Sequence, residues 1–119
     1  GSLNMKVSIY HNPRCSKSRA TLALLREQGI EPEIVEYLKD PPSRETLEQL
    51  LDMLGLEPLA LMRTKEKEFR ELGLAKGEAD RESLIQAMLD HPRLMERPIV
   101  VRGRKAALGR PPENVLEIL

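Results

Sequence analysis

The most reactive side chain in this sequence belongs to its single cysteine, Cys15. It follows His11-Asn12-Pro13, and cations stand near it in the chain at Arg14, Lys17 and Arg19. The next residues favour a helix, so the cysteine lies where unpaired backbone N–H groups, the helix dipole and nearby cations all favour thiolate over thiol. A lone cytoplasmic cysteine is more often a small buried hydrophobe, but this context predicts a reactive nucleophile.

Spacing excludes two common cysteine chemistries. A Cys-x-x-Cys dithiol needs a second cysteine where the chain has Ser18, so any resolving thiol must come from outside the chain. A phosphatase loop of the form Cys-x5-Arg needs arginine where the chain has Thr21. A fall of the thiol pKa from about 8.5 to about 6.5 would add only about threefold to the rate at pH 7, because the thiolate that forms is intrinsically less nucleophilic. An enzyme built on Cys15 must therefore also position its substrate and neutralise its charge.

Composition narrows the function further. The chain has 119 residues, of which 40% are hydrophobic, and this indicates one domain. Its 19 Lys and Arg residues balance its 19 Asp and Glu residues, so no net charge attracts nucleic acid or an anionic membrane. One cysteine and two histidines are too few for a structural zinc site. No apolar run approaches the roughly 20 residues that cross a bilayer, and the amino terminus does not resemble a signal peptide, so we expect a cytoplasmic protein. Gly1 to Asn4 reads as a cloning remnant before a natural start at Met5.

The first part of the chain must place Cys15 between a strand and a helix. Residues 6–10 alternate polar and apolar, and residues 16–28 carry leucine and alanine at helical spacing. Gly29 ends that helix, and residues 34–37 form a second short strand. We expect a β-α-β unit with parallel strands and a right-handed crossover.

Helical patterns dominate the middle of the chain, and strands return near its end. Ser43 caps a helix through residue 54, and Asp80 caps another that runs to about residue 90. Between them we expect a helical turn at 58–62 and a helix at 65–72, and after them a hairpin of strands 99–101 and 105–108 and a final helix at 113–119. The expected order is β-α-β, a helical insertion at about 43–95, and β-β-α, within one domain over 5–119.

The stretch from His11 to Arg19 resembles the glutaredoxin-coupled arsenate reductase family, ArsC. Other segments that resemble family signatures follow in family order: Tyr37-Leu38, Pro41 to Arg44, Leu61 to Arg63, Glu71 to Ala75, Glu96 to Val101 and Gly109 to Pro111. The resemblance covers nearly the whole chain from Met5. It implies an α/β, thioredoxin-like fold with a mixed four-stranded sheet and a helical insertion.

The resemblance implies that Cys15 is the nucleophile and that Arg63, Arg97 and Arg110 bind the arsenic oxyanion. The chemistry of guanidinium fits this role, because it stays charged and its planar fork matches tetrahedral oxyanions. A surface residue or a helix-end ion pair is the ordinary alternative for any one arginine. Pro98, which precedes the third expected strand, is expected to be cis and to face Cys15, with a trans turn proline as the alternative.

Three polar residues near Cys15 complete the expected site. His11 resembles a family position that lowers the cysteine pKa, although a bond that only orders the loop explains it equally well. Asn12, which we place with the substrate-binding residues, and Ser18 can hold the loop and the helix start by side-chain bonds. Ser18 is also a candidate donor to the Cys15 thiolate. We expect no metal and no bound cofactor.

Taken together, the resemblance predicts a monomeric arsenate reductase with glutathione as co-substrate and glutaredoxin as partner. Because Leu119 directly follows the last expected helix, whereas better-known members carry a further tail, a general glutathione-dependent thiol oxidoreductase is a second interpretation. A third is a regulator of the Spx type, which binds RNA polymerase without catalysis. Ser18 lacks the thiol of the Spx switch, and the three arginines favour an enzyme.

Overall fold

The computed structural model describes residues 6–74, 77 and 79–119, which fall into two compact units. The sheet unit combines the chain up to Asp40 with Arg97–Leu119, and the helical unit is Pro41–Glu96. The expected remnant before Met5, Met5 itself and Ala75 of the family signature lie outside the described residues. Each unit has its own elements, and the site residues are divided between them.

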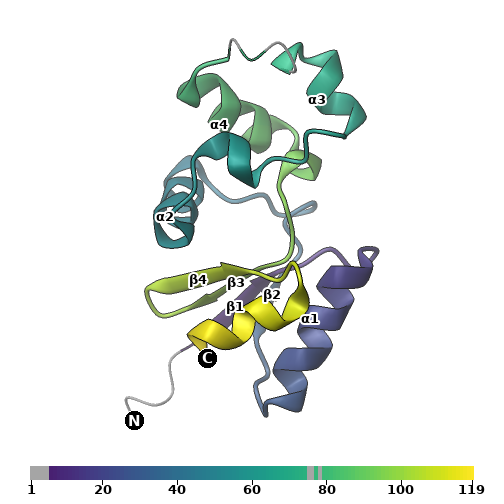
Figure 1. The fold of residues 1–119 in the computed structure, drawn as a ribbon, viewed down its shortest axis with the longest axis vertical. Coiled ribbons are helices and arrows are strands. Elements are labelled where there is room, and N and C mark those ends of the chain that lie inside the picture. The colour runs from purple at the N-terminus through teal and green to yellow at the C-terminus, as the bar shows by residue number, and fades with distance from the viewer. Residues whose placement is uncertain (1–5, 75–76, 78) are drawn as a thin grey trace. The chain divides into compact units, whose positions relative to one another are not determined.

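The sheet unit holds four strands in the order β2-β1-β3-β4 (Figure 1). Their bounds are Val7–Tyr10 for β1, Glu33–Val35 for β2, Ile99–Arg102 for β3 and Lys105–Leu108 for β4. β1 pairs with β2 in parallel and with β3 antiparallel, and β3 and β4 form the expected hairpin. This mixed sheet with its helices confirms the expected α/β class.

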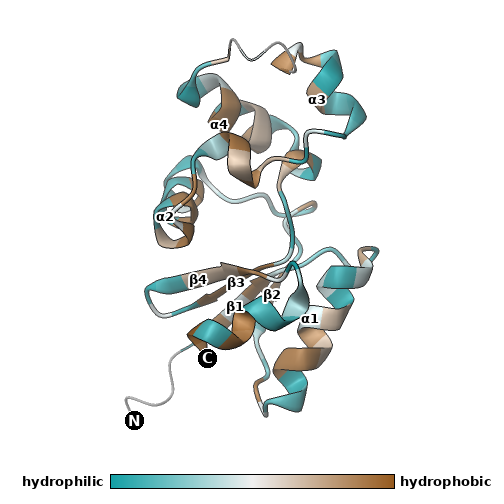
Figure 2. Cartoon of the chain, viewed as in Figure 1, coloured by the Kyte–Doolittle hydropathy of each residue, from teal (hydrophilic) through white to brown (hydrophobic). Residues whose placement is uncertain are grey.

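A helix and a 3-10 helix complete the core of the sheet unit. Helix α1, Ser16–Glu27, and the 3-10 helix η4, Pro112–Ile118, contact each other. Their apolar side chains join those of the strands, which are coloured largely as hydrophobic in Figure 2. The buried cluster consists of Val7, Ile9, Leu25, Val100 and Val115. Because Leu25 of α1 is part of this cluster, the packing anchors the helix that begins beside Cys15.

The helical unit contains two longer helices and shorter turns. Its elements are α2 at Arg44–Leu54, the 3-10 turn η1 at Pro58–Leu61, α3 at Lys67–Glu71, α4 at Arg81–Asp90 and the 3-10 turn η3 at Pro92–Leu94. α4 contacts α2, η1 and η3, and Met62 pairs with Met95 in an isolated antiparallel bridge. In Figure 2, α2 and α4 each contain both hydrophobic and hydrophilic residues, as expected for a helix with one buried face.

The polar caps predicted for the two longer insertion helices are confirmed. The Ser43 hydroxyl accepts a hydrogen bond from the N–H of Thr46 at 3.1 Å, and Asp80 Oδ1 accepts one from the N–H of Ser83 at 2.8 Å. Each oxygen satisfies an N–H group that has no partner within its own helix. Among the described residues, no helix is long and apolar enough to cross a membrane.

Three predicted elements differ from the structure in type or by two residues at one end, whereas the other bounds agree to within one residue. The second strand, predicted at 34–37, is Glu33–Val35, because the chain turns back at Glu36, whose carbonyl accepts bonds from Lys39 and Asp40. The helix predicted at 65–72 is limited to Lys67–Glu71. The final segment is a 3-10 helix rather than an α-helix. Prolines at its start lack N–H donors, and its ends are closed by bonds between residues three apart.

Candidate active site

The loop between β1 and α1 is held by short-range hydrogen bonds that fix the backbone of Cys15. The Cys15 N–H donates to the Asn12 carbonyl at 3.0 Å, and the Asn12 side-chain oxygen accepts from the N–H of Arg14 at 3.0 Å. The Cys15 carbonyl in turn accepts from the N–H of Arg19 at 3.0 Å, which starts the helix. Cys15 is therefore the N-cap residue of α1, in extended conformation with φ −94° and ψ 123°.

The surroundings of Cys15 favour its thiolate form. Burial acts to raise the pKa of the thiol, but the N–H groups of Ser18 and Lys17 and the guanidinium of Arg97 outweigh burial, so the pKa lies below that of an ordinary cysteine. Both N–H groups belong to the first turn of α1, where they lack an acceptor within the helix, and hydrogen bonding from them favours the thiolate. The predicted helix-start activation of the thiol is present in this geometry.

Ser18 is the centre of a buried polar network behind the loop. Its side chain is 0% exposed, and its hydroxyl oxygen lies 2.6 Å from His11 Nδ1 and accepts a bond from the N–H of Asn12 at 3.0 Å. The sequence predicted that Asn12 and Ser18 hold the loop by side-chain bonds, and both do so. Because the Ser18 hydroxyl is engaged here, the group of Ser18 that acts on Cys15 is its backbone N–H.

His11 is nearly buried, with 5% of its surface exposed, and its side chain is hydrogen-bonded to Ser18. Burial lowers the pKa of His11, and the positive charges of Arg19 and Arg26 lower it too, whereas Glu36 opposes them. A neutral imidazole accepts a hydrogen bond from the Ser18 hydroxyl at Nδ1. We infer this tautomer from the network, because the Ser18 oxygen already accepts a hydrogen bond from the N–H of Asn12. Of the two roles considered for His11, this arrangement favours loop ordering.

Two arginines of the sheet unit stand at the strand ends near Cys15. Arg97 precedes β3, and its guanidinium is one of the groups that lower the Cys15 pKa. Arg110 follows β4, and its Nη1 donates to the Arg97 carbonyl at 3.1 Å. The Arg97–Pro98 peptide bond is cis, as predicted, and the Arg110–Pro111 bond is cis as well, which the sequence analysis did not anticipate. The structure thus places the Arg97 guanidinium where it acts on Cys15 and ties Arg110 to the backbone of Arg97.

The third predicted arginine, Arg63, belongs to the helical unit. Its Nε lies 3.0 Å from Glu66 Oε1, its Nη1 lies 3.9 Å from Glu96 Oε1, and its side chain is 25% exposed. The Arg63 N–H donates to the Leu94 carbonyl at 2.7 Å, which fixes its backbone beside η3. The sequence analysis missed both carboxylate partners, although Glu66 follows Arg63 at a spacing that permits an ion pair.

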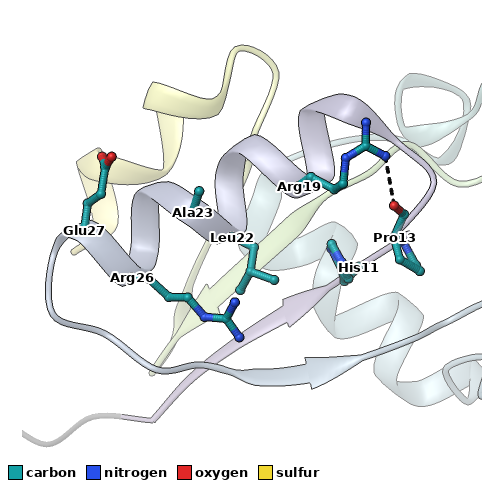
Figure 3. Close-up of a pocket in the computed structure, with 7 residues that line it drawn as sticks. All are labelled: His11, Pro13, Arg19, Leu22, Ala23, Arg26 and Glu27. Atoms are coloured by element: carbon teal, nitrogen blue, oxygen red, sulfur yellow. Dashed lines mark hydrogen bonds between the residues drawn. The ribbon is translucent and has the colours of Figure 1, made fainter.

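A groove of about 640 Å³ runs along α1 (Figure 3). It is lined by His11, Pro13, Arg19, Leu22, Ala23, Arg26 and Glu27. Its two arginines are engaged within the chain: Arg19 donates to the Pro13 carbonyl at 2.9 Å, and Arg26 is bound by both carboxylate oxygens of Glu31 at 3.0 and 3.1 Å. Both guanidinium groups of this groove therefore already have acceptors within the protein.

The site chemistry is that of a thiolate with cations beside it. Within the described residues, no group of three His, Cys, Asp or Glu side chains is placed to hold a metal ion. Thiolate and guanidinium groups suit nucleophilic attack on a small oxyanion, because the cations offset the charge that the attack brings together. The profile of the ArsC family matches residues 10–118.

The chain belongs to the ArsC family. An arsenate reductase of Neisseria meningitidis is 48% identical over 115 residues, which are 96% of this chain and 98% of that protein. The uncharacterized protein YfgD of Escherichia coli K12 is 57% identical over 118 residues, 98% of this chain and 99% of that one.

A solved structure extends the likeness of this ArsC-family chain to three dimensions. The arsenate reductase from Vibrio cholerae has a TM-score of 0.93 at 54% identity, covering 97% of this chain and 98% of that chain. This likeness confirms the thioredoxin-like fold that the sequence resemblance implied.

Proposed function

We propose that this chain reduces arsenate to arsenite, with Cys15 as the nucleophile. The observation that carries the proposal is the lowered pKa of Cys15, to which the Arg97 guanidinium contributes. Arg110 is tied to the backbone of Arg97, so a second guanidinium belongs to the same cluster. Relatives that share about half of this sequence carry the name arsenate reductase, which supports arsenate as the oxyanion.

The first proposed step forms a bond between Cys15 and arsenic. The thiolate attacks the As(V) atom of arsenate, an oxygen leaves as water after taking up protons, and a thiol-arsenate adduct remains on Cys15. Arg97 and Arg110 bind the oxyanion and offset its charge as the anionic thiolate approaches. Because thiolate activation alone adds only about threefold, we assign most of the rate enhancement to these arginines and to positioning.

The second proposed stage uses two external thiols. Glutathione bonds to arsenic through its thiol, and a second oxygen leaves as water. A glutaredoxin thiolate then attacks the glutathione sulfur, which forms a glutathione–glutaredoxin disulfide and leaves two electrons on arsenic. Water cleaves the remaining bond between Cys15 and As(III), which releases arsenite and restores the Cys15 thiol. Ser18, where a dithiol motif would have its second cysteine, is the reason for invoking external thiols. Glutathione acts as co-substrate and not as a bound cofactor in this scheme.

Arg63 is proposed as a further substrate-binding residue on the family resemblance. A cytoplasmic location and a monomeric state also stay predictions.

A coupled assay tests the proposal. Purified protein with arsenate, glutathione, glutaredoxin and glutathione reductase should oxidise NADPH, and Cys15→Ser should remove that rate. The absence of any rate that depends on both arsenate and Cys15 would contradict the proposal. Turnover of a glutathionylated peptide without arsenate reduction would favour the general thiol oxidoreductase. Capture of RNA polymerase by a protein without turnover would favour the Spx-type regulator.

A further inference from the structure

We propose that Gly109 is a positioning residue that sets the placement of Arg97 and Arg110 relative to Cys15. Gly109 ends the hairpin, directly after β4 and directly before Arg110. Its function follows from the missing side chain, which lets three segments of the sheet unit meet at one point. The inference rests on the proposed function, because it assumes that these arginines serve a reaction at Cys15.

The space beside Gly109 is too small for a methyl group. A Cβ atom built there would lie 2.8 Å from Pro98 Cγ and 3.1 Å from Thr21 Cγ2, and still closer to Thr21 Oγ1. Separations below 3.0 Å essentially never occur for a real Cβ atom, so something would have to move. Close packing of this kind leaves no room for even one added carbon without displacement.

Neither neighbour of Gly109 can yield by a simple side-chain rotation. Thr21 is 0% exposed, is β-branched, and its hydroxyl donates to the Lys17 carbonyl at 2.8 Å. Pro98 carries its Cγ in a rigid ring, and its carbonyl accepts the Gly109 N–H at 2.9 Å. A methyl group at position 109 must therefore push backbone segments apart.

The segments that would move are those that carry the chemistry. Thr21 lies on α1, the helix that begins beside Cys15, and Pro98 directly follows Arg97. The Arg110 guanidinium, which follows Gly109, is bound to the Arg97 carbonyl at 3.1 Å. A displacement at Gly109 is thus transmitted to both arginines and to the helix that presents the thiolate.

Gly109 differs in kind from four other glycines of the chain. Gly29, Gly55, Gly73 and Gly77 have φ values between 68° and 79°, and a Cβ atom at each would meet nothing within 4 Å. Those glycines serve a left-handed backbone conformation. Gly109 has no such φ, so its requirement for glycine comes from close approach alone.

The variant Gly109→Ala tests the proposal by kinetics and by the titration of Cys15. We expect kcat/KM for arsenate to fall about 10- to 100-fold, since displacement of a reacting group by about 1 Å costs that much. We also expect KM to rise and the Cys15 pKa, followed by thiolate absorbance, to move toward that of an ordinary cysteine. A folded variant with the KM and Cys15 titration of the parent protein would overturn the proposal.

Gly29→Ala is the matched control. It places a methyl group at a left-handed position after α1, so it lowers the unfolding free energy, but it should leave KM and the Cys15 titration unchanged. If Gly29→Ala and Gly109→Ala shift KM equally at equal loss of stability, Gly109 has only a structural role and the proposal fails.

A second variant keeps the test decisive if Gly109→Ala does not fold. Thr21→Ala removes two of the three close contacts, so the double variant Gly109→Ala/Thr21→Ala, measured against Thr21→Ala alone, should regain part of the lost arsenate kcat/KM and titration shift. Where Gly109→Ala folds, the absence of any recovery relative to it would contradict the proposal. Where it does not fold, a double variant without a deficit relative to Thr21→Ala would contradict the proposal. If the parent protein proves inactive on arsenate, the Cys15 titration still measures the positioning by Gly109 independently of the proposed reaction.

Discussion

Arg97 of the sheet unit and Arg63 of the helical unit act on opposite kinds of partner. In the sheet unit, the Arg97 guanidinium acts on a thiol and helps to lower its pKa. In the helical unit, Arg63 faces carboxylates at 3.0 and 3.9 Å, and Arg93 lies 3.5 Å from Glu66. Carboxylate partners compensate a guanidinium charge, whereas a thiol partner is itself activated by it. We infer that the sheet unit activates the nucleophile and that Arg63 of the helical unit affects substrate affinity.

The largest expected effect lies at the nucleophile. Cys15→Ser replaces the thiolate with a hydroxyl that stays protonated at pH 7, so arsenate turnover should fall by about 10³-fold or more. The coupled NADPH assay measures the loss, and circular dichroism checks that the fold is retained. Residual activity within tenfold of the parent protein would remove Cys15 from the mechanism.

Variants of Arg97 and Arg63 test whether the two arginines have different roles. Arg97→Ala should lower kcat/KM by about 10²- to 10³-fold, as loss of one oxyanion-stabilising donor does, and should raise the Cys15 pKa. Arg63→Ala should raise KM and leave the Cys15 pKa unchanged. Steady-state kinetics and thiol alkylation against pH measure both. Equal shifts of the Cys15 pKa in the two variants would break the division of roles.

Two serine variants compare how much a side-chain hydrogen bond contributes to the unfolding free energy in each unit. Ser18→Ala leaves buried His11 Nδ1 and the Asn12 N–H without their partner, so the unfolding free energy should fall by about 1–3 kcal/mol. Ser43→Ala removes an exposed helix cap in the helical unit and should cost about 1 kcal/mol. Urea denaturation measures both. A larger loss in Ser43→Ala would show that the Ser18 network contributes little to the sheet unit.

The smallest expected effect is a pH dependence of the unfolding free energy that arises from His11 in the sheet unit. Because the pKa of His11 is lowered in the folded chain, the unfolded state binds more protons below about pH 6.5. The unfolding free energy should therefore decrease as pH falls from about 6.5 through the folded pKa, and then level off. Denaturation at several pH values, with His11→Asn as comparison, measures this. An identical slope in the variant would assign the effect to other groups.

Local signals explain what the sequence could predict. Ser43 and Asp80 were recognisable as caps because a cap depends on residues within one turn, and both capping bonds are present. The strand pairing followed from short turns and β-branched residues, and the hairpin is confirmed. The resemblance supplied Arg97, which does lie where its charge acts on Cys15.

Contacts between distant segments explain what the sequence could not predict. The partner of Ser18 is His11, seven residues away across a loop whose path no periodicity encodes. The sequence offered Gly109 only as part of a segment that resembles a family signature, and the approach of Thr21 and Pro98, from two other segments, reveals why glycine is required. The pairing of Arg63 with Glu96 likewise depends on chain reversal through η3.

Titration of Cys15 with and without sulfate tests the central claim most directly. A thiolate beside the Arg97 guanidinium should titrate below the range of an ordinary cysteine, and a bound oxyanion should raise its pKa, because the added negative charge disfavours thiolate. Thiolate absorbance against pH measures both effects. An ordinary titration that sulfate does not move would contradict an activated nucleophile in an oxyanion site.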